Sequence, residues 1–203
     1  MTELRTIGVL HGVSIAVAAW DSAMAAVDLS FACMFERELN DAGPVGGLRH
    51  LDDALGGALA ELRRAGYFRA TPMETLLISR PPATVVARAV MVVGLGDPSI
   101  WSPAVTAEAA ATAVRAAIQQ RVESAAFAPS LLDAGLTSSD TSDVAATMLK
   151  AVADAIAAQA RIAAIGLAPS HLLRQWVFDV GAAHLDTVTD HFQATLAALT
   201  PAI

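Results

Sequence analysis

The sequence predicts an α/β fold in which helices cover a mixed sheet. Short apolar or β-branched segments alternate with amphipathic or alanine-rich segments of helical length along the 203 residues. The run Ala89-Val90-Met91-Val92-Val93 contains no polar residue, as expected for a central strand that is covered on both faces. Hydrophobic residues make up 55% of the chain and charged residues 16%, so the chain is able to fill a large core and is not disordered.

The predicted strands are short segments rich in apolar or β-branched residues and bounded by turn residues. They span residues 6–10, 15–20, 28–35, 74–79, 87–94, 124–127 and 175–180. A polar stretch over 36–47 follows the third strand and carries the turn signals Asn40-Asp41 and Gly43-Pro44. Pro81-Pro82 separates the fourth strand from the central one.

The first predicted helix spans residues 48–65. Its leucines recur at three- and four-residue spacing and form one apolar stripe, made of Leu48, Leu51, Leu55, Leu59 and Leu62. Gly66 is expected to end the helix, because glycine readily takes the left-handed conformation of a helix terminus.

Three more helices are predicted in the second half of the chain. The first begins at Ser102-Pro103, which offers an N-cap and a first-turn proline, and runs to about Arg121. The second spans 142–165 and ends at Gly166, and the third spans 183–199. The alanine-rich composition favours closely packed helices.

The charge balance excludes several classes of partner. The net charge is −7, and Lys150 is the only lysine, so we expect no binding to nucleic acid or to an anionic membrane surface. The single cysteine, Cys33, fits a reducing compartment and is predicted to be a buried, inert strand residue. Residues 7–20 are apolar, but no net positive charge precedes them and His11-Gly12 interrupts them, which disfavours a signal peptide and favours a cytoplasmic location.

A family becomes recognisable in the segment from Leu51 to about Arg121. The segment LDDALGGALAELRRAGYFRATPMETLLISRPPATVVARAVMVVGLG starts at Leu51 and continues into the helix after Trp101. VDLSFACMFE precedes it and QWVFDVGAAHLDTVTDHFQATL follows it. A leucine-rich helix, a small loop, and a strand ending in V-G-L-G before a long helix resemble, in this order, the amino-terminal domain of the leucyl aminopeptidases. The resemblance covers most of the chain from about Val27 and implies a three-layer α/β/α macro-like domain with a mixed, largely parallel sheet.

The resemblance also implies that the chemistry of that family belongs to another domain. In the leucyl aminopeptidases a carboxy-terminal domain holds two metal ions, a catalytic lysine and an N-T-D-A-E-G-R motif. The 203 residues contain no such motif, and Lys150 lies in an ordinary predicted helix. A two-metal site needs several converging carboxylates, and the expected ones are missing from the sequence. We therefore expect residues 1–203 to form one domain with no catalytic residue, resident metal or cofactor.

The best candidate for a ligand site is Gly94-Leu95-Gly96-Asp97. It lies between a buried strand and a helix, where open α/β sheets often bind ligands, and its glycines permit a close approach to the backbone. It is not a G-x-G-x-x-G motif and no Walker lysine follows, so a tight strand-to-helix turn is the simpler interpretation. Macro-like folds are associated with ADP-ribose. By that analogy alone Asp28 is a candidate for recognising an adenine amino group, beside the simpler interpretation of a solvated strand-end aspartate.

Two further groups of ionisable residues are candidates, one for metal binding and one for acid/base catalysis, and their spacing disfavours both. His184, Asp186, Asp190 and His191 form the only His/carboxylate cluster, but the two histidines are seven residues apart rather than the three or four typical of a metal-binding helix. Asp52 and Asp53 are adjacent on a predicted helix and point in different directions, which disfavours paired acid/base catalysis.

The leading functional hypothesis is a non-catalytic binding, regulatory or assembly module that contacts itself or another protein. The first alternative is a domain that binds, or hydrolyses, ADP-ribose or a related nucleotide at Gly94–Asp97. The second alternative is an accessory subunit of a split aminopeptidase that works beside a separate catalytic chain.

Overall fold

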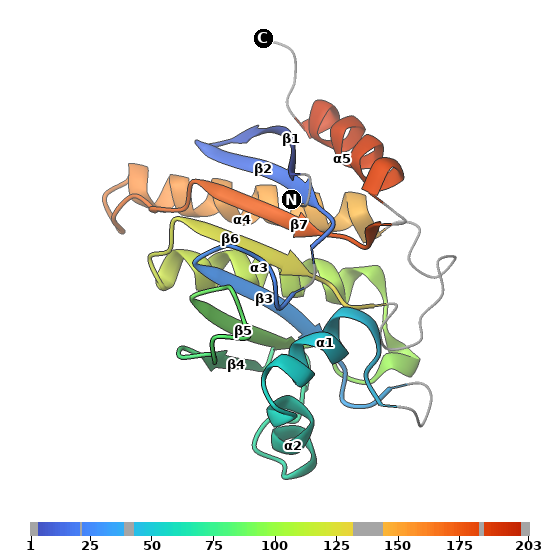
Figure 1. Ribbon diagram of the computed structural model, residues 1–203. Helices are drawn as coiled ribbons and strands as arrows, with labels where there is room; N and C mark the ends of the chain where they lie inside the picture. The colour runs from blue at the N-terminus through green and yellow to red at the C-terminus, as the bar shows by residue number, and fades with distance from the viewer. Residues whose placement is uncertain (1–3, 21, 39–42, 132–143, 183–184, 200–203) are drawn as a thin grey trace.

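One seven-stranded sheet runs through the protein (Figure 1). The structure is a computed structural model, and it describes residues 4–20, 22–38, 43–131, 144–182 and 185–199. The strand order is β1-β2-β7-β6-β3-β5-β4. The strand bounds are β1 Leu4–Leu10, β2 Val13–Ala18, β3 Leu29–Met34, β4 Thr75–Ile78, β5 Ala89–Gly94, β6 Ser124–Ala128 and β7 Gln175–Asp179. Each of them overlaps a segment that the sequence predicts as a strand.

The sheet is mixed and largely parallel, as predicted. The five inner strands β2, β7, β6, β3 and β5 pair in parallel, whereas the edge strands β1 and β4 are antiparallel to their neighbours. In the register of β3 and β5, Leu29 lies opposite Ala89 and Met34 lies opposite Gly94. The carboxyl ends of these strands therefore meet at one edge of the sheet and their amino ends at the other.

Helices cover both faces of the sheet and complete three layers (Figure 1). The helix bounds are α1 Gly46–Ala54, α2 Ala58–Arg64, α3 Pro103–Gln119, α4 Val144–Ala164 and α5 Leu185–Leu199, with one 3₁₀ turn, η1, over Pro98–Ile100. Side chains of α3, α4 and α5 pack on one face, and those of α1 and α2 pack on the other. None of the described helices is long and apolar enough to cross a membrane.

The two faces of the sheet have separate cores because side chains alternate along each strand. In β3, Phe31 and Cys33 belong to the core beneath α3, α4 and α5, whereas Ala32 and Met34 belong to the core beneath α1 and α2. The first core centres on Trp176, which is fully buried. Its ring centroid lies 6.0 Å from that of Phe31. This burial of apolar surface on both faces is the main stabilising contribution to the fold.

The prediction of one helix over residues 48–65 is wrong, because α1 and α2 are separate helices. Gly56 and Gly57 take positive φ values of 70° and 82°, which interrupts the helical backbone between them. The carboxylate of Asp52 accepts hydrogen bonds from the N–H groups of Leu59 (2.8 Å) and Ala60 (3.3 Å), so α1 supplies the cap of α2.

The predicted glycine termini are confirmed. Gly66 has a φ of 77°, and the N–H of Tyr67 donates to the carbonyl of Leu62 at 3.0 Å, which closes α2 in a Schellman motif. Gly166 ends α4 in the same way, with a φ of 78° and a bond from Leu167 N–H to Ile162 O at 3.1 Å.

Candidate functional site

The Gly94–Asp97 segment lies where the sequence predicts it, between β5 and η1 at the carboxyl ends of the parallel strands. The N–H groups of Gly94, Leu95 and Gly96 are already engaged by the protein. Gly94 N–H donates to Glu74 O at 2.8 Å, Leu95 N–H to Met34 O at 2.9 Å, and Gly96 N–H to Ala70 O at 2.9 Å. An anion would have to displace one of these bonds to be held by the turn.

The glycines of this turn are needed because another backbone segment approaches them. A Cβ placed on Gly94 would lie 2.1 Å from Thr71 O, and one placed on Gly96 would lie 2.7 Å from Pro72 Cγ. Gly96 also has a φ of 77°, a conformation that glycine adopts at little cost. The space that a ligand would use beside these glycines is filled by residues 70–72.

Glu74 holds the segment that fills this space. Its Oε2 accepts hydrogen bonds from the N–H groups of Arg69 and Thr71, both at 3.1 Å, and from Thr71 Oγ1 at 3.2 Å. Ala70 and Met73 have positive φ values of 60° and 62°, a left-handed conformation that is unfavourable for residues other than glycine. No spacing or motif in the sequence signals that this segment folds back onto the glycine turn.

Asp97 caps the 3₁₀ turn. Its Oδ1 accepts hydrogen bonds from Ser99 N–H (2.9 Å), Ser99 Oγ (2.8 Å) and Arg37 Nη2 (2.9 Å). The bonds from Ser99 and the nearby Arg37 charge hold the pKa of the Asp97 carboxyl below its ordinary value. Pro103 is the first residue of α3, as predicted, but the Ser102 hydroxyl makes no capping hydrogen bond.

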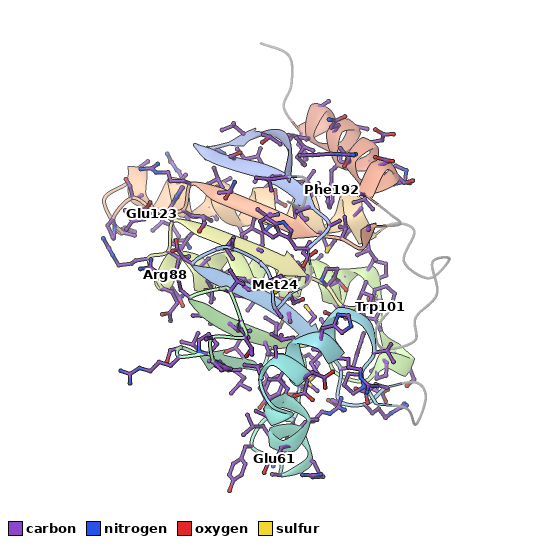
Figure 2. The ribbon with its side chains drawn as sticks, viewed as in Figure 1. Met24, Glu61, Arg88, Trp101, Glu123 and Phe192 are labelled. Carbon is purple, nitrogen blue, oxygen red and sulfur yellow. The ribbon has the colours of Figure 1, made fainter. Side chains whose placement is uncertain are left out.

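Asp28 lies at the opposite end of the sheet from the glycine turn. It precedes β3 on the side of Ala89, five residues along β5 from Gly94, which is a separation of roughly 17 Å. Figure 2 shows Arg88 and Glu123 at this end and Trp101 at the other. Asp28 and the Gly94–Asp97 turn therefore do not form one site.

The Asp28 carboxylate joins three segments. Its Oδ2 accepts hydrogen bonds from the N–H groups of Glu123 and Ser124, both at 3.0 Å, and from Ser124 Oγ at 3.1 Å, and Oδ1 accepts one from Arg88 at 3.0 Å. Burial by itself raises the pKa of Asp28. The bonds from Arg88, Ser124 and Glu123 outweigh it and leave the pKa below its ordinary value.

Of the remaining candidates, Asp186, Asp190 and His191 lie on α5. His184 lies outside the described residues, and Asp186 forms an ion pair with Arg5 of β1. Among the described residues, no group of three or more His, Cys, Asp or Glu side chains is arranged to hold a metal ion. Cys33 is fully buried, and burial raises the pKa of its thiol.

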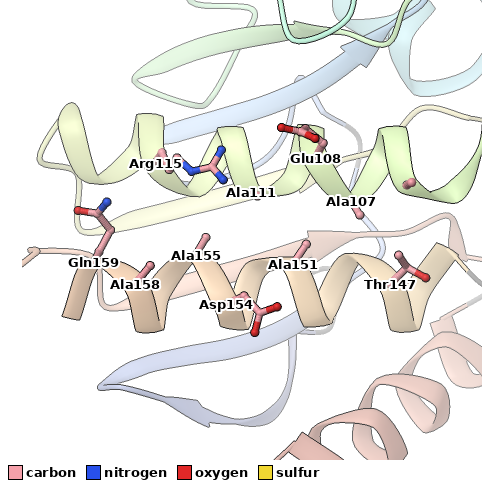
Figure 3. A pocket seen from close by; sticks show the side chains of 11 residues that line it. Ala107, Glu108, Ala111, Arg115, Thr147, Ala151, Asp154, Ala155, Ala158 and Gln159 are labelled. Carbon is pink, nitrogen blue, oxygen red and sulfur yellow. The ribbon is translucent and has the colours of Figure 1, made fainter. Parts of the chain in front are cut away.

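A groove that no sequence pattern predicted runs between α3 and α4 (Figure 3). It is open to solvent and has a volume of about 410 Å³. Its floor and walls are mostly alanine, and the lining residues are Ala104, Ala107, Glu108, Ala111, Arg115, Thr147, Ala151, Asp154, Ala155, Ala158 and Gln159. The alanine-rich composition of both helices is the signal in the sequence from which it could have been expected.

Solved structures with a similar fold include two macrodomains. The Trypanosoma brucei macrodomain in complex with ADP-ribose superposes with a TM-score of 0.67 and 15% identity, over 95% of this chain and 74% of that one. The Oceanobacillus iheyensis macrodomain with ADP gives 0.65 and 13% identity, over 98% of this chain and 100% of that one. The macro-like three-layer fold predicted from the sequence is therefore confirmed.

An aminopeptidase has the same fold over part of its length. A mutant of tomato leucine aminopeptidase superposes with a TM-score of 0.62 and 17% identity, and the alignment covers 95% of this chain but 38% of the tomato chain. Comparison with curated protein sequences found no significant match. The family model described as "Cytosol aminopeptidase family, N-terminal domain" matches residues 33–170, which is more than half of the chain. The chain therefore belongs to the cytosol aminopeptidase family, through the N-terminal domain of that family.

Proposed function

We propose that this chain is a non-catalytic binding and assembly module that acts in the cytoplasm through contact with protein. The observation that carries the proposal is the closure of the Gly94–Gly96 turn. All three of its N–H groups donate to carbonyls of the protein, and residues 70–72 occupy the space beside its glycines. The most ligand-like feature of the sequence is thus used for packing, while the α3–α4 groove remains open.

The first test asks whether the chain binds small molecules or hydrolyses a peptide substrate. Thermal unfolding is followed with ADP-ribose, ADP, Zn²⁺ and Mn²⁺, and hydrolysis of leucyl-p-nitroanilide is measured with and without the metals. The proposal expects no shift of the midpoint and no hydrolysis. A ligand at a hundred times its Kd stabilises the fold by about 2.7 kcal/mol, which is roughly 5–10 °C for a domain of this size. A shift of that size or measurable hydrolysis would contradict the proposal.

The second test asks whether the chain assembles with itself or with another protein. Native mass spectrometry and sedimentation of the purified chain should detect a species heavier than the 20.9 kDa monomer. A chain that remains monomeric and forms no complex with a separately produced aminopeptidase catalytic domain would contradict the proposal. A complex with that catalytic domain would instead support the accessory subunit of a split aminopeptidase, which the family membership also favours.

A nucleotide-binding role is the other candidate, supported by the macrodomain structures solved with ADP and ADP-ribose. Its test needs a variant that alters the turn without disrupting the fold. Gly94 is unsuitable, because its Cβ would meet the backbone of Thr71. Asp97→Ala is suitable, because its side chain is 38% exposed. An ADP-ribose-induced shift that Asp97→Ala changes would favour the nucleotide role at this turn.

A further inference from the structure

The α3–α4 face differs in charge from the rest of the molecule. The charged residues that line the groove are Glu108, Arg115 and Asp154, for a net charge of −1. The whole chain has a net charge of −7, so the remaining residues carry −6. Two copies of an acidic chain repel one another over most of their surface, and this face is one where a second copy meets little net repulsion.

The shape of the same face permits another helix to approach closely. Six of the eleven residues that line the groove are alanines, and none of the eleven is aromatic or a long aliphatic residue (Figure 3). Helices pack with interaxial distances of about 8–10 Å, and small side chains at the contact favour the lower end of that range.

Glu108 and Arg115 determine which helix fits. They are seven residues apart, which is two helical turns, and both line the groove from α3. Neither forms an ion pair with another described residue. If two α3 helices lie antiparallel about a two-fold axis between Ala111 and Thr112, Glu108 of each copy meets Arg115 of the other. A two-fold interface requires such self-complementarity, whereas an unrelated partner does not.

We propose that the α3–α4 face is the contact surface of a two-fold homodimer, in which antiparallel α3 helices pair Glu108 with Arg115 of the second copy. The inference rests on the proposed function, because it names the partner and the surface of the assembly module. Alanines such as Ala111 form the centre of the contact, and the two ion pairs flank it and set the register. A polar rim around a close-packed centre is the usual organisation of a protein interface.

The test is a charge-reversal cycle measured by sedimentation velocity over a range of concentrations. The wild-type chain should be a dimer that dissociates on dilution. Arg115→Glu and Glu108→Arg each place like charges across the interface and should weaken the dimer about tenfold or more. The double variant Glu108→Arg/Arg115→Glu restores opposite charges and should return the dissociation constant to near the wild-type value. Arg64→Glu on α2, on the opposite face, is the matched control and should leave it unchanged.

A steric variant makes the test independent of charge. Ala158→Trp fills the groove from an exposed position of α4 and should also weaken the dimer. Circular dichroism and thermal midpoints confirm that each variant is folded. A wild-type chain that is monomeric at all concentrations would overturn the inference, as would a dimer that neither the single reversals nor Ala158→Trp weakens. A dimer through another face, or a complex with a different protein, would overturn it while leaving the assembly role intact.

Discussion

The carboxylate of Asp52 in α1 caps the next helix, accepting a hydrogen bond from the N–H of Leu59 in α2 at 2.8 Å. Asp52 is buried, whereas its neighbour Asp53 is exposed and lies 3.7 Å from Arg49 across one turn of the same helix. Two adjacent aspartates of one helix therefore have different roles. Asp52 joins α1 to α2 across the Gly56-Gly57 break, and Asp53 forms a solvated ion pair.

Asp52→Ala should lower the free energy of unfolding by about 1–2 kcal/mol, because it removes the side-chain acceptor at the start of α2. Asp53→Ala is the matched control and should cost no more than about 0.5 kcal/mol, as exposed ion pairs contribute little. Urea unfolding followed by circular dichroism measures both. Equal effects of the two substitutions would show that the cap does not stabilise α2.

Asp28→Asn should destabilise the fold at neutral pH by about 1.5–3 kcal/mol, because several hydrogen bonds to a charged carboxylate are weakened. The folded-state pKa of Asp28 is lowered, so its charge-dependent stabilisation is fully present above the ordinary pKa of about 3.8. It is lost as the pH falls through the lower folded-state pKa. The difference between wild type and variant should therefore be constant from about pH 5 to 7 and shrink below about pH 4.

The control for this profile is Asp53→Asn, which removes an exposed ion pair with Arg49. It should change stability by less than about 0.5 kcal/mol at any of these pH values. Denaturant unfolding at fixed ionic strength gives the profile for each protein. A wild-type minus Asp28→Asn difference that does not change between pH 7 and pH 3 would show that the carboxylate charge is not what stabilises this end of the sheet.

Gly94→Ala should destabilise the protein by about 3 kcal/mol or more, because the added methyl group overlaps the Thr71 carbonyl in a close-packed region. Gly66→Ala is the matched control. Gly66 has nothing within 4 Å of a built Cβ, so its substitution should cost only the left-handed backbone penalty of about 1–2 kcal/mol. Thermal unfolding compares the two, and a smaller loss at Gly94 than at Gly66 would mean that residues 70–72 do not close the turn.

Cys33 should be unreactive in the folded protein. The thiolate is the reactive form, and full burial raises the pKa of this thiol and blocks access to it. With a chromogenic disulfide reagent at pH 8, the native chain should react at least about 100-fold more slowly than the chain unfolded in guanidinium. Equal rates would show that β3 opens readily in the native state.

Local chemistry allowed much of the fold to be predicted from the sequence. The apolar run of β5, the leucine spacing of α1 and α2, and the glycines at 66 and 166 act through neighbouring residues along the chain, so their consequences are readable without a structure. The resemblance of the segment from Leu51 to about Arg121 is confirmed by the family match over residues 33–170. The break at Gly56-Gly57 was missed, because an isolated stripe of leucines continues through two glycines and the cap from Asp52 depends on how the chain turns there.

The fate of the candidate sites depended on contacts between residues far apart in the sequence. The Thr71 carbonyl lies against Gly94, and the Asp28 carboxylate accepts a hydrogen bond from Ser124, which is 96 residues away. The α3–α4 groove exists because two alanine-rich helices lie side by side on one face of the sheet. Periodicity and turn residues are properties of neighbouring residues, and they determined the elements of this protein and their order. Only the packing of those elements decided which glycines lie against another segment, which carboxylates accept hydrogen bonds from distant residues, and which helical face stays open.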